Sequence, residues 1–172
     1  MNIVEVRVNG LILENKTQQN VVILREVDGA RILPIWIGPS EAHAIRRLLA
    51  DEEFPRPLTH DLICIVVEGL RAKITRIVIA DLRENTFFAS VFIERESEVL
   101  SVDARPSDSI AIALRAKASI YVNEKLLQEP PRPDEGGGGG GEGPPPTEED
   151  KAEQLRRYLE RLNPEDFGKF QL

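Results

Sequence analysis

Two histidines, His43 and His60, are the only imidazoles in the 172-residue chain. Imidazole is the side chain whose ordinary pKa lies closest to neutrality, so these residues are the first candidates for a general base that activates water. His60 is followed directly by Asp61, and we predict that both are catalytic. Neighbouring residues on a helix point in different directions, so Asp61 need not orient His60. The alternative for His60 is a non-catalytic first-turn residue packed against Pro57 and Leu58.

Carboxylates lie at the expected boundaries of helices and strands: Glu41, Asp61, Asp103 and Asp108. Carboxylates are the side chains with which enzymes commonly hold Mg²⁺ or Mn²⁺. We therefore predict Glu41, Asp103 and Asp108 as ligands of Mg²⁺ or Mn²⁺. The structural alternative is that Glu41 and Asp108 are first-turn acids favoured by the helix dipole, with Ser40 and Ser107 as helix caps.

Arg105 precedes Pro106, which forces an extended backbone, and it stands where a helix is expected to begin. That position suits contact with an anion, and we predict Arg105 as a catalytic residue that meets negative charge on a phosphate. The alternative is an ion pair with Asp103, Asp108 or Glu41.

His43 lies three residues before Arg46 and four before Arg47, which places them on one helical stripe. Arg46 and Arg47 together also form a candidate basic surface patch. We predict that His43, Arg46 and Ser107 contact the substrate. The alternative for His43 is a solvated surface position.

A repeat that would position these residues appears when the chain is compared with itself at an offset of 67. The segment from Leu33 to Ile45 then matches Leu100 to Ile112, and Glu41 falls on Asp108. Upstream of each matched segment lie stretches of alternating and β-branched residues. With these stretches included, each copy is predicted to be three strands followed by a helix. The sequence predicts an α+β fold with a mostly antiparallel sheet and an internal duplication of this unit.

Between the two copies lies an apolar run, Leu62 to Val67, which could be a buried strand or a helix. Thr59 as a cap, Asp61 in the first turn and Gly69 just past the end favour a helix. Trp36 and Cys64 stand in apolar strings and are predicted to lie in the core.

The domain organisation follows from composition. Residues 1–127 form the predicted folded domain, and residues 128–146, rich in Pro and Gly, form a predicted disordered linker. Residues 147–172 form a tail in which Thr147 caps an amphipathic helix that ends before Asn163 and Pro164. Its stripe of Leu155, Leu159 and Leu162 is expected to dock on the domain or on another subunit, and together with uncovered strand edges it predicts a homo-oligomer.

Net charge is −7, but most of it lies in the tail. Residues 1–127 carry 16 Lys and Arg against 18 Asp and Glu, so the body is nearly neutral. The single cysteine excludes internal disulfides, zinc fingers and iron–sulfur clusters. No secretory leader and no membrane-length apolar run are evident, so the cytoplasm is the expected location and no membrane contact is expected.

Three segments taken together resemble the bifunctional nuclease domain family: Leu33 to Ile45, Arg56 to Leu62, and Asp103 to Ala111. The resemblance covers about residues 1–127. It implies an α+β fold with an internal duplication and the cleavage of both DNA and RNA, with nucleic acid as substrate. The competing hypothesis is a non-catalytic binding or regulatory module that oligomerises. Convergence of the predicted site residues would favour the enzyme, and separate ion pairs would favour the module.

Overall fold

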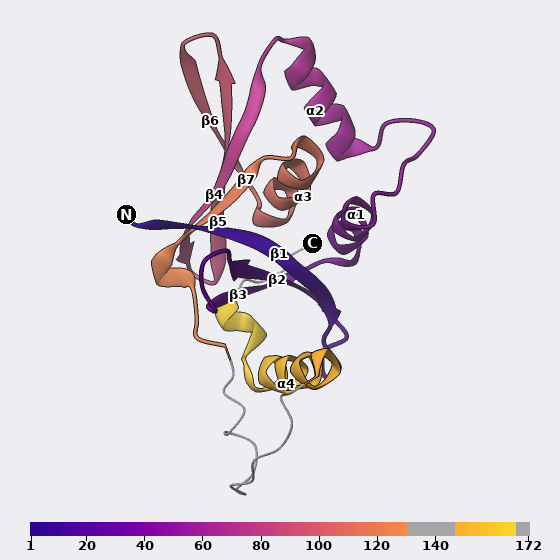
Figure 1. The fold of residues 1–172 in the computed structure, drawn as a ribbon, viewed down its shortest axis with the longest axis vertical. Helices are drawn as coiled ribbons and strands as arrows, with labels where there is room; N and C mark the ends of the chain where they lie inside the picture. The colour runs from indigo at the N-terminus through magenta and orange to yellow at the C-terminus, as the bar shows by residue number, and fades with distance from the viewer. Residues whose placement is uncertain (131–146, 168–172) are drawn as a thin grey trace, which may run out of the picture.

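The computed structural model describes residues 1–130 and 147–167. Its centre is a seven-stranded sheet in the order β3-β2-β1-β7-β4-β5-β6. Figure 1 shows α1, α2 and α3 grouped on one side of the molecule and α4 apart from them, beside the end that carries β1 to β3. The strands are β1 (Ile3–Leu13), β2 (Asn20–Glu26), β3 (Ile32–Ile37), β4 (Lys73–Arg83), β5 (Thr86–Arg95), β6 (Glu98–Ala104) and β7 (Ser119–Asn123).

Pairing in the sheet is antiparallel except between β4 and β7, which run parallel. The predicted α+β fold with a mostly antiparallel sheet is therefore confirmed. In chain order, β1, β2 and β3 lead into α1, and β4, β5 and β6 lead into α3. This order has the predicted form of three strands and a helix twice, but the internal duplication itself stays a prediction.

The core lies between the sheet and the helices α1 (Pro39–Leu49), α2 (Thr59–Gly69) and α3 (Pro106–Ala116). β2 and β3 are buried along almost their whole length, which explains their runs of Val, Ile and Leu. Trp36 and Cys64 are both buried, as predicted.

The helix starts differ slightly from the predicted ones. Ser40 and Ser107 are not caps, because α1 and α3 begin one residue earlier at Pro39 and Pro106. Proline needs no hydrogen-bond partner for its nitrogen and its fixed φ suits the first helical position. Likewise Thr59 is the first residue of α2 rather than its cap, and Gly69 is its last residue.

The C-terminal helix α4 (Glu148–Arg161) docks on the chain's own body. Thr147 caps it, as predicted, and the structure adds a reciprocal pair between Thr147 and Asp150. Leu159 is 1% exposed, and the 3₁₀ turn η3 (Pro164–Phe167) places Phe167 against Trp36 with ring centroids 5.6 Å apart. The apolar stripe of α4 is therefore covered within this chain, so it offers no surface to a second copy.

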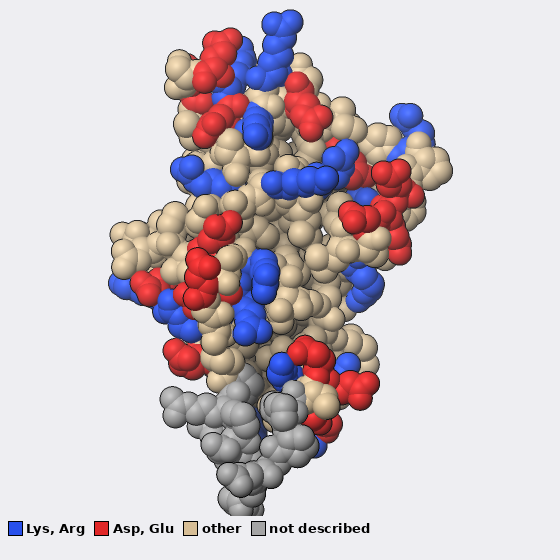
Figure 2. Space-filling model, in the orientation of Figure 1, with Lys and Arg blue, Asp and Glu red and all other residues tan. Residues whose placement is uncertain are grey.

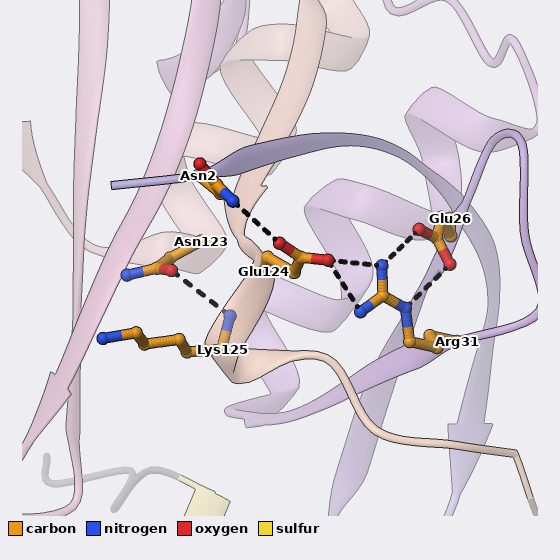
Figure 3. Close-up of polar contacts among 6 residues, drawn as sticks. All are labelled: Asn2, Glu26, Arg31, Asn123, Glu124 and Lys125. Atoms are coloured by element: carbon orange, nitrogen blue, oxygen red, sulfur yellow. Dashed lines mark hydrogen bonds and ion pairs between the residues drawn. The ribbon is translucent and has the colours of Figure 1, made fainter.

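Arg31 ties the end of the domain to its beginning (Figure 3). It donates to Glu26 and, across the sheet, to Glu124 of the 3₁₀ turn η1 (Glu124–Leu126), which also accepts from Asn2. Gln128, the first residue of the predicted linker, pairs with Ile32 in an isolated β-bridge. Residues 131–146 of that linker lie outside the described residues.

No helix in the described ranges is long and apolar enough to cross a membrane.

Candidate active site

The candidate site lies where the first turns of three helices meet. The third residue of each helix is acidic: Glu41 in α1, Asp61 in α2 and Asp108 in α3. A carboxylate is favoured there by the unpaired backbone N–H groups and by the helix dipole. The same local rule thus places three carboxylates, and the packing of α1 and α2 on α3 decides which of them meet.

Four side chains from these helices form one connected cluster, which we call the Arg105 network: Glu41, His60, Arg105 and Asp108. Arg105 Nη1 lies 3.1 Å from Glu41 Oε1, and Arg105 Nε lies 2.8 Å from Asp108 Oδ2. The other oxygen of Asp108 lies 3.0 Å from His60 Nε2. The two positions matched by the sequence repeat, Glu41 and Asp108, therefore share one guanidinium.

Exposure differs sharply within the Arg105 network. The side chains of Glu41 and His60 are largely buried, whereas the Arg105 side chain is 60% exposed. The backbone of Arg105 is extended, with φ −66° and ψ 146°, as predicted from the proline that follows it. The Arg105 network therefore presents at the surface an arginine that two carboxylates hold in place, and the largely buried His60 contacts one of those carboxylates.

The charge state of the Arg105 network follows from its contacts. The hydrogen bond from His60 and the ion pair with Arg105 outweigh burial and lower the pKa of Asp108 to about 2. The hydrogen bond to Asp108 in turn raises the pKa of Arg105. Asp108 is thus ionised at neutral pH and can only accept a hydrogen bond from Nε2 of His60. In the tautomer that donates this bond, Nδ1 is the ring nitrogen that carries the lone pair.

Asp61 does not partner His60, contrary to the pairing expected from their adjacency. Its oxygens lie 3.0 Å from Arg47 Nη2 and 3.0 Å from Arg115 Nε, and it accepts the backbone N–H of Leu58 at 2.9 Å. Burial opposes ionisation of Asp61, but these donors lower its pKa overall. Asp61 therefore holds the start of α2 and links it to the ends of α1 and α3.

Arg47 is the residue of this region that sequence reasoning misplaced. It was expected in a surface patch with Arg46, but it is only 4% exposed and is paired with Asp61, with Phe54 stacked 5.6 Å from its guanidinium carbon. An arginine two residues before the end of a helix gives no signal of burial. Only the packing of α1 beside α2 shows it.

The remaining predicted residues lie outside the Arg105 network. His43 and Arg46 are exposed on α1, with Arg46 Nη2 3.5 Å from Asn20 Oδ1. Ser107 is buried, and Asp103 is exposed on β6. The structure thus joins Glu41, His60, Arg105 and Asp108, and it leaves Asp103 without a contact to them within the described residues.

The donor set of this site does not fit a divalent cation in the described geometry. No group of three or more His, Cys, Asp or Glu side chains in the described parts of the chain is close enough to hold a metal ion. Both oxygens of Asp108 are engaged, and Arg105 lies between the two carboxylates that a metal would bridge. Glu41 Oε2 is buried without a hydrogen-bond partner, but one such oxygen is too few.

A cavity of about 680 Å³ opens beside Asp61. The end of α1, the following segment from Asp51 to Pro57, and the ends of α2 and α3 line it. Arg115 and Lys117 supply positive charge to its wall, and Asp51 to Glu53 supply negative charge. The face of the molecule in Figure 2 likewise shows acidic and basic side chains interspersed, without an extended stripe of one sign.

The fold and the cluster define an α+β domain with a histidine–carboxylate–arginine site at converging helix starts. The sequence model of the bifunctional nuclease domain matches residues 22–134. The chain therefore belongs to the bifunctional nuclease domain family.

Two kinds of relatives are similar to this chain. An uncharacterized protein of Mycobacterium tuberculosis is 43% identical over 165 residues, which cover 95% of this chain and 97% of the relative. Bifunctional nuclease 2 of Arabidopsis thaliana is 25% identical over 118 residues, covering 66% of this chain and 36% of the plant protein. Bifunctional nuclease 1 of Oryza sativa subsp. indica is 24% identical over 118 residues, again with 36% of that protein covered.

Proposed function

We propose that this protein hydrolyses phosphodiester bonds in DNA and RNA with little sequence selectivity. The observation that carries the proposal is the Arg105 network: a histidine oriented by an ionised aspartate stands next to an exposed arginine at a helix start. Family membership and the names of the plant relatives support nucleic acid as the substrate.

His60 is the general base in this proposal. Asp108 accepts the Nε2 hydrogen of His60 at 3.0 Å, which fixes the tautomer that carries a lone pair on Nδ1. Nδ1 takes a proton from water as the water oxygen bonds to phosphorus and the bond from phosphorus to one ester oxygen breaks. The departing oxygen takes a proton from solvent and leaves as the hydroxyl of the released strand. Asp108 acts as a positioning residue, because it remains ionised and stabilises the imidazolium that forms.

Arg105 meets the negative charge that develops on the phosphate oxygens. Glu41 and Asp108 hold its Nη1 and Nε, so the guanidinium is oriented before the substrate arrives. Preorganised donors of this kind contribute strongly to catalysis because they need no rearrangement in the transition state. The unpaired N–H groups at the start of α3 add positive potential at the same place.

Substrate affinity must come from residues around the Arg105 network. With His60 neutral, two carboxylates and one arginine give the network a net charge of −1, which repels a phosphodiester. His43 and Arg46 on the exposed side of α1 are the cations proposed to contact flanking phosphates. Asp61 keeps α2, and therefore His60, in position through Arg47 and Arg115.

A divalent cation, Mg²⁺ or Mn²⁺, was predicted to assist the reaction, and the family function makes it a natural expectation. Such an ion would neutralise charge on the phosphate oxygens. Because the described donor set does not fit one, none of the steps above passes through a metal. Reactions in MgCl₂, in MnCl₂ and in EDTA therefore belong in the same assay.

The test is a cleavage assay on fluorescently labelled single-stranded DNA and RNA with His60→Gln and Arg105→Ala. We expect each variant to keep the wild-type melting temperature and to lose about 10²–10⁴-fold in rate, as general-base loss typically does. Arg83→Ala is the matched control, because Arg83 forms an exposed ion pair with Asp81 on β4. It should cleave at the wild-type rate.

Equal trace activity in the wild type and in both site variants would identify a contaminating nuclease and contradict the proposal. The alternative is then a non-catalytic binding or regulatory module. One observation favours that alternative: each ionised carboxylate of the two clusters already has an arginine partner within the chain. The same variants separate the two functions, because a binding module would retain oligonucleotide binding without turnover.

A further inference from the structure

The outer face of α2 is apolar and uncovered by the described parts of the chain. Leu62 and Val66 of α2 and its C-cap residue Leu70 recur every four residues, and their exposed fractions are 54%, 52% and 60%. Ile63 and Ile65 flank this row, and Leu58 precedes it, each between 37% and 41% exposed. The inner face of the same helix buries Asp61, Cys64 and Val67. A helix that is apolar on both faces is normally covered on both faces.

We propose that a second copy of this chain packs on the outer face of α2 and that the protein is a homodimer with two-fold symmetry. The sequence predicted an oligomer partly from the apolar stripe of α4, but that stripe packs on the chain's own core. We therefore place the interface on α2. This proposal does not depend on the proposed hydrolysis, because it rests on the exposed apolar side chains of α2 and not on the Arg105 network.

The size of the patch agrees with a stable dimer. The six apolar side chains of this face expose roughly 500 Å² together, which is at the upper end for a single patch on a monomer. Interfaces are about 60% apolar, so this patch corresponds to about 800 Å² per partner once its polar rim is included. That is the ordinary size of a specific interface.

The pattern of the row indicates which partner fits. Read in either direction along α2, Leu62, Val66 and Leu70 give leucine, valine, leucine at a spacing of four residues. Two antiparallel copies related by a two-fold axis at Val66 therefore place Leu62 against Leu70 of the second copy, and Leu70 against its Leu62. Rows spaced by four residues on both helices interdigitate in the commonest class of helix packing. Such a self-complementary row is what a symmetric interface requires.

The interface would also bear on the candidate site. His60 and Asp61 lie in the first turn of α2, and Ile65, which flanks the exposed row, lines the cavity beside Asp61.

The test is light scattering coupled to size exclusion on the full chain at micromolar concentration. We expect the wild type at twice 19.3 kDa. Val66→Glu brings two like charges together at the two-fold axis and should raise the dissociation constant at least about a hundredfold. Leu100→Glu is the matched control, because Leu100 is equally exposed but lies on β6, and it should leave the dimer intact.

A charge pair tests the antiparallel arrangement. Leu62→Glu alone and Leu70→Lys alone should each weaken the dimer, and the double variant should restore it, because each new glutamate then faces a lysine of the second copy. In a parallel arrangement the double variant would place like charges together and stay monomeric. A wild-type monomer, or a dimer that survives Val66→Glu, would overturn the proposal.

Discussion

Asp108 is the residue on which the site depends, because it contacts both His60 and Arg105. The metal-binding role predicted from its type and place stays a prediction. The first-turn position explains the presence of a carboxylate, but the same position in α1 and α2 gives Glu41 and Asp61 different partners. The chemistry of each acid is thus set by the helix packed against it rather than by its own helix.

The first prediction concerns Asp108→Asn. A folded pKa of about 2, against 3.8 for the free side chain, means that the native state binds fewer protons than the unfolded chain in this range. The stability that Asp108 contributes is therefore full above pH 3.8 and is lost as the pH falls through about 2. By that linkage the substitution should lower the free energy of unfolding by about 2 kcal/mol at pH 7, and by about half as much at pH 3.

Denaturant titrations of the wild type and Asp108→Asn at pH 7, 4 and 3 would measure the difference. Asp81→Asn is the control, because Asp81 forms an exposed pair with Arg83 and should change stability much less. A gap that is constant from pH 7 to pH 3 would show that Asp108 contributes through packing or helix capping rather than through its charge.

At the scale of elements, α4 has its apolar face covered by the chain itself, whereas α2 leaves one apolar face exposed. Their sequences did not distinguish these two outcomes. Both are amphipathic or apolar helices with a face to cover. α4 reaches the chain's own β1–β3 end, where Leu155, Leu159 and Leu162 join the core. The outer face of α2 has no such cover in the described parts of the chain. Local pattern predicts that a face needs a partner, and only the arrangement of elements shows which one.

The element-scale prediction is that Leu159→Ala releases α4. Removing a fully buried leucine costs about 2–5 kcal/mol, which is comparable to the whole docking energy of one short helix. Amide exchange should rise in α4 and stay low in β4 and β5. Emission of Trp36, the only tryptophan, should shift to the red as Phe167 leaves it.

Arg156→Ala, an exposed change on the same helix, is the matched control and should alter neither signal. Unchanged exchange in Leu159→Ala would mean that the contacts of Tyr158 with Gln128 and of Phe167 with Trp36 hold α4 without Leu159.

At the scale of the whole molecule, charge limits how this protein can bind nucleic acid. The net charge is −7, and basic and acidic side chains alternate over the face in Figure 2. The clustered arginines Arg47, Arg105 and Arg115 are each paired with a carboxylate. These arginines therefore offer few free donors to a phosphate backbone, and binding at the site must rest on a small number of contacts.

The corresponding prediction is a shallow salt dependence. Fluorescence anisotropy of a labelled single-stranded oligonucleotide with His60→Gln, which blocks turnover, should give a slope of about −1 to −3 for log K against log salt concentration. Arg46→Ala should make the slope less negative by about one phosphate contact. A slope steeper than about −5 would reveal an extended basic surface and contradict this account.

Much of the fold was available from the sequence because its signals are local. Alternating apolar residues predicted the strands, and Thr147 predicted the cap of α4. The predicted caps Ser40 and Ser107 lie one residue after the observed starts of α1 and α3. The extended backbone of Arg105 followed from the proline after it. Each of these depends on backbone sterics or on hydrogen bonds within a few residues.

Tertiary structure decided how the acids and bases are paired. Residues 41, 60, 105 and 108 stand on three helices, and adjacency in sequence suggested Asp61 for His60, whereas the packing of α2 on α3 gives it Asp108. The same packing buries Arg47 with Asp61. Ion pairs between distant segments leave no periodic pattern in a sequence. Any carboxylate satisfies the preference for an acid in the first turn of a helix, and only the relative placement of the helices selects its partner.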